Sequence, residues 1–212
     1  IKGEYFLTSA QQKIREEFLG EAEKQELSFF CISANAGTGK TLLLYDIAKE
    51  ILNRGKHVKI IHCGLLNEGH KLLRDIYSWD IVPIRNISSQ SEFIDLCGCD
   101  YVFIDESQRI RQGQLDALTK KAVDCQIPLL FSFDVKQYLR GGETQNLTEY
   151  LENGFPGLTT ITRKLTNKIR TNKAMASFIT NLLNIGRSKD NLDYSGVSVE
   201  YFGDSLDLKS YI

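Results

Sequence analysis

A short glycine-rich segment constrains this chain more than any other feature of its sequence. Residues 33–41 read S-A-N-A-G-T-G-K-T, after an apolar run at 29–32 and before a helix-like run at 42–48. An apolar strand, a glycine loop, a Lys-Thr pair and a helix, in that order, form the context that a phosphate-binding loop requires. The pattern G-x-x-x-x-G-K-[ST] is kept except at its first glycine, where this sequence has Ala34.

The residue types of this segment suit a polyphosphate. Glycines allow consecutive backbone N–H groups to turn toward one anion, and a helix that starts at Lys40 adds the positive end of its dipole. Lys40 supplies a cation for the outer phosphates, and the hydroxyl of Thr41 is a ligand for Mg²⁺. We therefore expect a nucleotide to be bound by Ala36, Gly37, Thr38, Gly39, Lys40 and Thr41.

The composition of the chain fits a single globular domain. Its 212 residues are 42% hydrophobic, which is enough for a proper core, and we expect one domain over residues 1–212. The formal net charge is -1, so the chain lacks the overall basic signature of nucleic-acid binding, although a local basic strip is compatible with it. No apolar run approaches the roughly 20 residues of a membrane helix.

The cysteines indicate a reducing compartment. There are five, an odd number without the spacing of a disulfide framework. Cys31, Cys63 and Cys125 lie in mostly apolar runs, so we expect buried, reduced thiols in a cytoplasmic protein. The segment C-G-C at 97–99 has no second Cys or His pair near it in the sequence, and we interpret it as structural rather than metal-binding.

Apolar runs without polar alternation separate helical segments along the chain. This pattern predicts the α/β class, with a mainly parallel sheet flanked by helices on both faces. Polar residues follow several of these runs, and open α/β sheets place their ligands at such strand ends. We expect strands at residues 27–33, 57–63, 81–84, 101–104, 127–133, 158–165 and 197–202. A first helix is expected to be capped by Thr8 or Ser9. Further helices are expected at residues 40–53, 67–78, 88–96, 113–124, 145–152 and 173–183.

Two acidic residues end the apolar strand expected at 101–104. Asp105 fits the role of holding Mg²⁺ together with Thr41, and Glu106 fits that of orienting and deprotonating an attacking water. Alone, this pair would be read as a solvated acidic turn; beside a phosphate loop it favours nucleotide hydrolysis. Gln137 follows the strand expected at 127–133 and is either a sensor of the γ-phosphate or an ordinary polar loop residue.

The order of these segments resembles that of superfamily 1 helicases, which are RecA-like ATPases. Residues 36–41 resemble motif I. The letters D-E-S-Q at 105–108 resemble motif II, with Gln108 in the position that links it to motif III. The letters F-D-V-K-Q at 133–137 resemble motif III, G-D-x-x-Q, with phenylalanine in place of its glycine, and imply that Gln137 contacts the γ-phosphate.

Three further segments extend the resemblance. The letters L-T-S-A-Q at 7–11 resemble the Q motif and imply that Gln11 reads adenine. The letters H-C-G at 62–64 stand where motif Ia contacts single strands. The letters L-T-N-K-I-R-T at 165–171 resemble motif IV, L-x-x-x-[YF]-R-[ST], with isoleucine in place of the aromatic residue, and imply that Arg170 touches the γ-phosphate.

More narrowly, D-E-S-Q-R followed by L-T-x-K-I-R-T-N is similar to the Schlafen-like DNA/RNA helicase ATPases. The resemblance implies ATP and Mg²⁺ as cofactors, single-stranded DNA or RNA as a partner, and catalytic roles for Lys40, Glu106, Gln137 and Arg170. Superfamily 1 enzymes have two RecA-like lobes, and this sequence begins at Ile1 and has its one Met at 175. We therefore expect the N-terminal lobe of a larger protein, which binds ATP and hydrolyses it slowly by itself.

Other functions remain open. A P-loop ATPase could act as a switch without translocation. A small-molecule kinase would need an arginine-rich lid, for which Arg109 and Arg111 are candidates, although we interpret them as a solvated helix start. The basic residues that could contact nucleic acid form no dense patch and read individually as solvated charges: His62, Lys71, Arg74, Lys136, Arg140 and Lys164.

Overall fold

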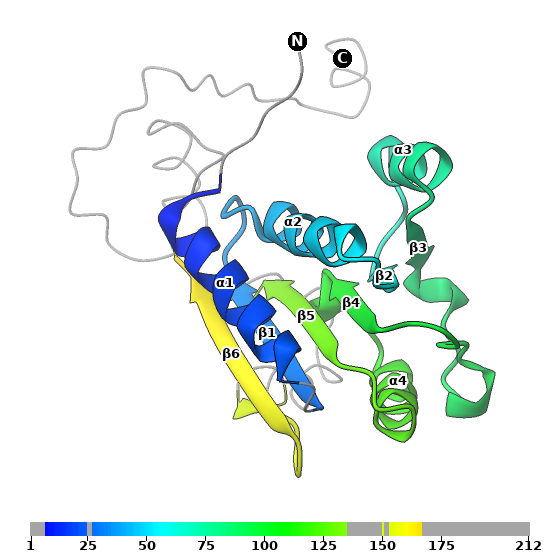
Figure 1. The fold of residues 1–212 in the computed structure, drawn as a ribbon. Helices are drawn as coiled ribbons and strands as arrows, with labels where there is room; N and C mark the ends of the chain where they lie inside the picture. The colour runs from blue at the N-terminus through cyan, green and yellow to red at the C-terminus, as the bar shows by residue number, and fades with distance from the viewer. Residues whose placement is uncertain (1–6, 25–26, 135–149, 151–152, 167–212) are drawn as a thin grey trace, which may run out of the picture. The chain divides into compact units, whose positions relative to one another are not determined.

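One parallel sheet forms the centre of the part of the chain that the structure describes. The computed structural model describes residues 7–24, 27–134, 150 and 153–166. Within them, six strands pair in parallel in the order β3-β2-β4-β5-β1-β6 (Figure 1), which confirms the predicted parallel sheet. The strands are β1 (Ser28–Ala34), β2 (Val58–His62), β3 (Asp80–Pro83), β4 (Tyr101–Asp105), β5 (Leu129–Asp134) and β6 (Thr159–Leu165).

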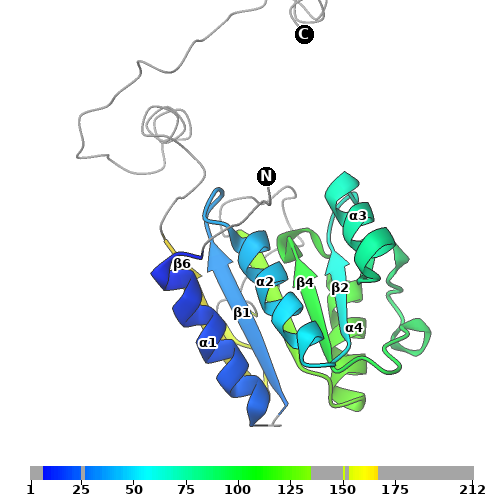
Figure 2. The ribbon, with the colours of Figure 1, turned by 45° about the horizontal axis from the view of Figure 1, so that its top comes forward.

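Helices cover both faces of this sheet, as the apolar strands predicted. Helices α1 and α2 lie on one face and α4 lies on the other (Figure 2). The fold is therefore of the expected α/β class. Among the described residues the α-helices are α1 (Ser9–Glu23), α2 (Lys40–Asn53), α3 (Glu68–Tyr77) and α4 (Gln112–Asp124).

Strand β1 shows why its sequence lacks polar alternation. Phe30 and Ile32 join the core cluster under α1 and α2, whereas Phe29 and Cys31 join the cluster under α4. Both faces of the strand are thus buried, and a large apolar side chain contributes roughly 1.5–3 kcal/mol when fully buried. Burial also raises the pKa of the Cys31 thiol to about 12, so this thiol stays protonated at neutral pH.

Helix α1 is fixed at its start and along its length. Thr8 caps it: the Thr8 hydroxyl accepts a hydrogen bond from the Gln11 N–H, and the Gln11 side chain accepts one from the Thr8 N–H. Further along, Arg15 lies 2.7 Å from Asp46 and 3.1 Å from Glu50 on α2. These contacts hold α1 against the helix that follows the glycine loop.

The segment at residues 88–96 differs from the short helix predicted there. Its described structure contains only a short 3₁₀ turn at Ser91–Phe93. The Ser88 hydroxyl accepts a hydrogen bond from the Gln90 N–H at 3.0 Å, an example of a serine side chain competing with helical pairing. Ile94 and Leu96 are both buried, two residues apart, as expected of extended backbone. The apolar spacing of this segment therefore reflects an extended chain.

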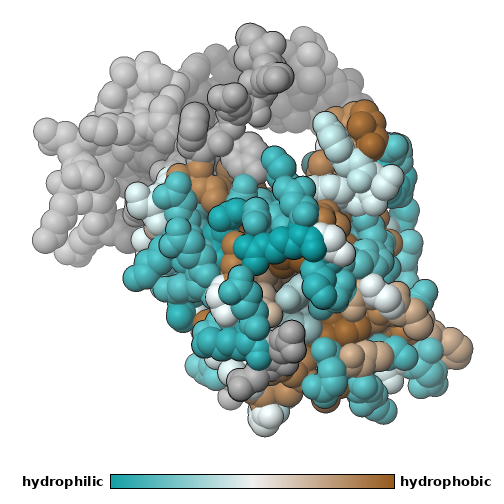
Figure 3. Space-filling view, in the orientation of Figure 1, coloured by the Kyte–Doolittle hydropathy of each residue, from teal (hydrophilic) through white to brown (hydrophobic). Residues whose placement is uncertain are grey.

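Helix α3 forms where it was predicted, but only part of its apolar face is covered. Leu72 is 54% exposed and Ile76 63% exposed, whereas His70 is buried. Brown, hydrophobic residues accordingly reach the surface at α3 in Figure 3. The helical period of this segment predicted the helix correctly, although among the described residues its apolar face packs on the core at Leu73 and stays exposed at Leu72 and Ile76.

Several predicted elements lie outside the described residues. These are most of the helix expected at 145–152, the helix at 173–183 and the strand at 197–202. Within the described part of the chain, no helix combines the length and the apolar character needed to cross a membrane.

Candidate nucleotide-binding site

The glycine-rich segment forms a loop between β1 and α2, as its sequence predicted. Gly37 and Gly39 adopt φ angles of 79° and 78°, a conformation that side chains disfavour. Helix α2 begins at Lys40, with Gly39 at its N-cap and no side-chain cap. The free N–H groups of the first helical turn therefore face the loop, where the helix dipole favours an anion.

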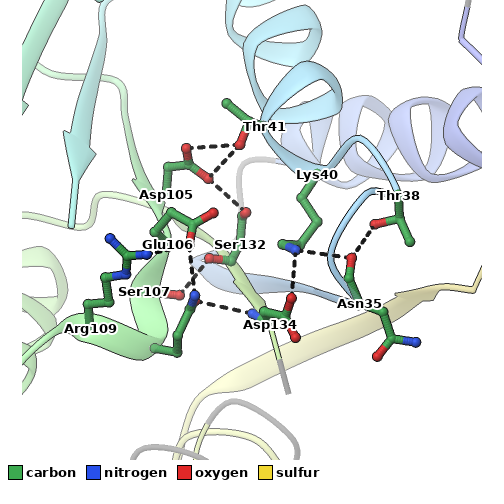
Figure 4. A network of polar contacts seen from close by, with 11 residues as sticks. Asn35, Thr38, Lys40, Thr41, Asp105, Glu106, Ser107, Arg109, Ser132 and Asp134 are labelled. Carbon is green, nitrogen blue, oxygen red and sulfur yellow. Dashed lines mark hydrogen bonds and ion pairs between the residues drawn. The ribbon is translucent and has the colours of Figure 1, made fainter. Parts of the chain in front are cut away.

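Lys40 is held inside the loop. Its side chain is only 7% exposed, and its Nζ donates to the Asn35 carbonyl at 3.2 Å and lies 3.5 Å from Asp134 Oδ2 (Figure 4). The Thr38 hydroxyl donates to the same Asn35 carbonyl at 2.9 Å. The ammonium group thus lies at the carboxyl ends of β1 and β5, where Ala34 and Asp134 stand side by side in the sheet register.

Asp105 is fully buried at the end of β4 and collects contacts from three other segments. Thr41 Oγ1 donates to Asp105 Oδ2 at 3.2 Å, and Ser132 Oγ donates to Oδ1 at 3.0 Å. His62 Nδ1 lies 3.3 Å from Oδ2, because the register of β2 and β4 places His62 beside Asp105. The structure therefore brings together Thr41 and Asp105, the residues predicted to bind Mg²⁺. A hydroxyl and a carboxylate are the oxygen ligands that Mg²⁺ prefers.

Glu106 lies directly after Asp105 but contacts a different residue. Its backbone is left-handed, with a φ of 56°, and its carboxylate accepts a hydrogen bond from Gln108 Nε2 at 2.7 Å. Gln108 Oε1 in turn accepts from the Asp134 N–H at 3.1 Å. Gln108 thus links the end of β4 to the end of β5, which confirms the expected connection between the second and third motifs.

The contributions of Ser132 and Ser107 to the site were not predicted from the sequence. Ser132 Oγ binds Asp105, and the Ser107 hydroxyl donates to the Ser132 carbonyl at 2.9 Å. Ser132 could have been noticed as the one hydroxyl in the apolar strand L-L-F-S-F-D. Phe133, the residue that replaces the motif glycine, is fully buried in the core on the α4 side.

Gln11 contacts the glycine loop directly. Its buried side-chain amide donates to the carbonyls of Thr38 and Gly39 at 3.2 and 3.4 Å, while its oxygen accepts from the Thr8 N–H at 2.8 Å. In this arrangement the amide ties α1 to the phosphate loop. Recognition of adenine by Gln11 stays a prediction.

Burial and negative charge define the electrostatics of the site. Burial raises the pKa of Cys63 above its usual range, and the charges of Asp105 and Glu106 raise it further. Burial, followed by the charge of Asp105, likewise raises the pKa of Tyr45. These shifts report a poorly solvated, electronegative region, which favours a bound cation.

The remaining predicted residues are dispersed or lie elsewhere. Gln137 and Arg170 fall outside the described residues, as do Lys136 and Arg140. Of the other candidate contacts for nucleic acid, Lys71 pairs with Glu68 and Arg74 with Asp75. Lys164 lies on the edge strand β6, several strands away from His62 on β2. Arg111 is the N-cap of α4, in line with a helix start.

The fold and the loop together define the class of P-loop NTPases, with a RecA-like α/β architecture. The sequence profile of the Schlafen group 3, DNA/RNA helicase domain matches residues 27–212, and the chain belongs to this family. Helix α1, with Gln11, precedes the matched range. No curated protein matches the chain.

Solved structures with a similar fold are remote in sequence. The Pif1 helicase from Candida albicans matches with a TM-score of 0.54 at 15% identity, over 85% of this chain and 44% of that one. AMPPCP-bound DnaA from Aquifex aeolicus matches with a TM-score of 0.50 at 15% identity, over 87% and 56%. The replication initiator DnaA bound to AMPPCP and single-stranded DNA gives 0.50 at 14%, over 87% and 55%. The chain spans about half the length of these proteins.

Proposed function

We propose that this chain is the ATP-binding and ATP-hydrolysing lobe of a superfamily 1-type DNA/RNA helicase or translocase. The observation that carries the proposal is the hydrogen bond between Thr41 and the fully buried Asp105, at the mouth of the loop that holds Lys40. Removing a carboxylate from water is costly unless it is neutralised or hydrogen-bonded. Asp105 is therefore suited to be the ligand of a cation, and the adjoining loop is suited to bind the phosphates that accompany Mg²⁺.

Each residue then has a role that follows from its place. The N–H groups of residues 36–41 surround the phosphates, and Lys40 neutralises the outer ones in exchange for its present partners, Asn35 and Asp134. Thr41 and Asp105 would hold Mg²⁺, which would neutralise charge on the phosphates. Glu106 orients and deprotonates the attacking water, a role that its partly buried position permits.

Two more residues complete the proposed site. Gln137 and Arg170, which follow the described strands β5 and β6 in the sequence, would contact the γ-phosphate. We further propose that a second RecA-like lobe supplies the opposite wall of the site, and that the protein acts on single-stranded DNA or RNA in the cytoplasm. The family to which the chain belongs and the five free cysteines support these assignments.

Nucleotide binding by the 212-residue chain is the first test. Calorimetry with a non-hydrolysable ATP analogue should show binding that strengthens with Mg²⁺. Lys40→Ala should weaken it by about tenfold or more, because a charge-assisted contact contributes roughly 1.5–3 kcal/mol. Lys49→Ala is the matched control, since Lys49 is an exposed lysine on the same helix. Equal affinities of the two variants would contradict the proposed site.

Hydrolysis separates the motor from the alternatives. We expect the isolated chain to release phosphate slowly, and a longer protein that includes the second lobe to be stimulated by single-stranded DNA or RNA. That stimulation should weaken as salt is raised, because phosphate contacts release counterions. A longer protein with no response to nucleic acid would favour a nucleotide switch, and phosphate transfer to a small acceptor would favour a kinase. Rapid, nucleic-acid-stimulated hydrolysis by this chain alone would contradict the need for a second lobe.

A further inference from the structure

A second group of ligand-type side chains lies at the other end of the sheet from the phosphate loop. His57 immediately precedes β2, Asp80 is the first residue of β3, and Cys99 lies just before β4. One ligand atom from each, an imidazole nitrogen, a carboxylate oxygen and a thiol sulfur, lies within 4.8 Å of the other two. The three strands are neighbours in the sheet, so the cluster joins the beginnings of β3, β2 and β4.

The imidazole of His57 is oriented as a metal ligand. Its Nδ1 lies 3.0 Å from the Gly98 carbonyl, and an N–H at Nδ1 donates to that oxygen. In the neutral ring this leaves the lone pair of Nε2 facing Asp80, whose Oδ2 is 3.4 Å away. Metal-bound histidines commonly donate their second ring nitrogen to a backbone carbonyl in this way, which fixes the tautomer.

The cluster already attracts a positive charge. Lys59 Nζ lies 2.6 Å from Asp80 Oδ2, and the Lys59 side chain is mostly buried. Nε2 of a neutral His57 and Asp80 Oδ2 both present lone pairs, so a cation between them relieves their repulsion. A divalent ion supplies more charge than the ammonium group, and would compete with Lys59 for Asp80.

We propose that His57, Asp80 and Cys99 bind a transition-metal ion, with Zn²⁺ the best match to the ligand set. Imidazole, thiolate and carboxylate are the three side-chain ligands that zinc uses, whereas Mg²⁺ and Ca²⁺ select oxygen alone. Ligands about 2.0–2.3 Å from tetrahedral zinc are roughly 3.3–3.8 Å apart. The ligand atoms now lie within 4.8 Å of one another, so small side-chain rotations would bring them to the spacing that zinc requires.

Such an ion would cross-link the beginnings of three strands and would not contact the nucleotide site. Cys99 is buried and His57 exposed, so the site has one closed side and one side open to a water as fourth ligand. The segment that connects β3 to β4 contains the buried Ile94 and Leu96 but only short 3₁₀ turns, so a cross-link at its end would restrain it. The proposal is independent of the proposed ATPase function.

Metal titration of the 212-residue chain tests the site. Co²⁺ should give the thiolate-to-metal charge-transfer band of a cysteine ligand, and Zn²⁺ should displace Co²⁺ and remove the band. Cys99→Ser should abolish this band, and His57→Gln should weaken zinc binding by about tenfold or more. His57 is exposed, so its replacement keeps the proposal testable if Cys99→Ser unfolds the chain, which circular dichroism reports.

Two further variants make the outcome decisive. Cys125→Ser changes a free cysteine outside the cluster, which is exposed and not buried as its sequence context predicted, and this variant should leave the Co²⁺ spectrum unchanged. Lys59→Met removes the competing cation and should increase the affinity for zinc. The proposal is overturned if the native chain gives no charge-transfer band, if the band persists in a folded Cys99→Ser variant, or if it disappears with Cys125→Ser.

Discussion

At the carboxyl ends of its strands the sheet buries charged side chains, whereas at the amino ends it leaves several of them at the surface. Asp105 and Lys40 are buried and contact residues from distant parts of the sequence. At the opposite end, the ion pair between Lys56 and Asp100 is exposed, and the His57 side chain is 45% exposed. Buried charges are costly without partners, and exposed pairs contribute little to stability. The comparison indicates that the carboxyl ends of the strands are arranged to bind a ligand.

The strongest test of this comparison removes the charge of Asp105. Asp105→Asn keeps the shape of the side chain but weakens the hold on Mg²⁺. We expect a loss of about 3–4 kcal/mol of transition-state stabilisation, or roughly 10²–10³-fold in the single-turnover rate of phosphate release. Asp116→Asn, at an exposed position on α4, is the control and should keep the native rate. Equal rates in both variants would contradict the assignment of Asp105 to the metal site.

A second test breaks the attachment of α1 to the loop. Gln11→Ala leaves the carbonyls of Thr38 and Gly39 without their side-chain donor. We expect the free energy of unfolding to fall by about 1–3 kcal/mol, because buried polar groups lose their partner. Urea denaturation measures this change. Gln12→Ala, at the adjacent exposed position, should change stability far less, and a similar loss in both would refer the effect to the helix as a whole.

A third variant sharpens the role of a residue that the sequence did not single out. Ser132→Ala removes one of the hydrogen bonds to Asp105 and leaves the Thr41 contact in place. We expect the Mg²⁺ concentration for half-maximal hydrolysis to change several-fold, in line with about 1 kcal/mol for one hydrogen bond. Thr119→Ala removes a hydroxyl on α4 that donates to the backbone carbonyls of Leu115 and Asp116, and as a control it should leave the Mg²⁺ dependence unaltered.

The smallest effect is expected at the amino ends of the strands. Lys56→Ala removes an exposed ion pair with Asp100, and the free energy of unfolding should change by no more than about 1 kcal/mol. Nucleotide affinity should stay at the native value. A larger loss of stability in urea, or a lower affinity for nucleotide, would show that the amino and carboxyl ends of the strands are coupled more strongly than their contacts indicate.

Local signals predicted the framework well. The loop at 33–41, the helix beginning at Lys40 and the strand ending in Asp105 all formed within a residue or two of expectation. Each of these signals comes from neighbouring residues: glycines that permit positive φ, a helix start, and a short apolar run. The prediction at 88–96 was wrong, because burial of Ile94 and Leu96 decided that segment rather than its helical spacing.

By itself, the sequence determined the phosphate loop, the apolar strands and thus the α/β class, because these depend on local conformation and on which residues avoid water. Only the tertiary structure decided which side chains meet: Thr41 with Asp105, Ser132 with Asp105, and Gln11 with the loop. It also brought His57 and Asp80 to Cys99, whose segment alone had been interpreted as structural. Such partners are distant in the chain, and their proximity follows from the order of strands in the sheet.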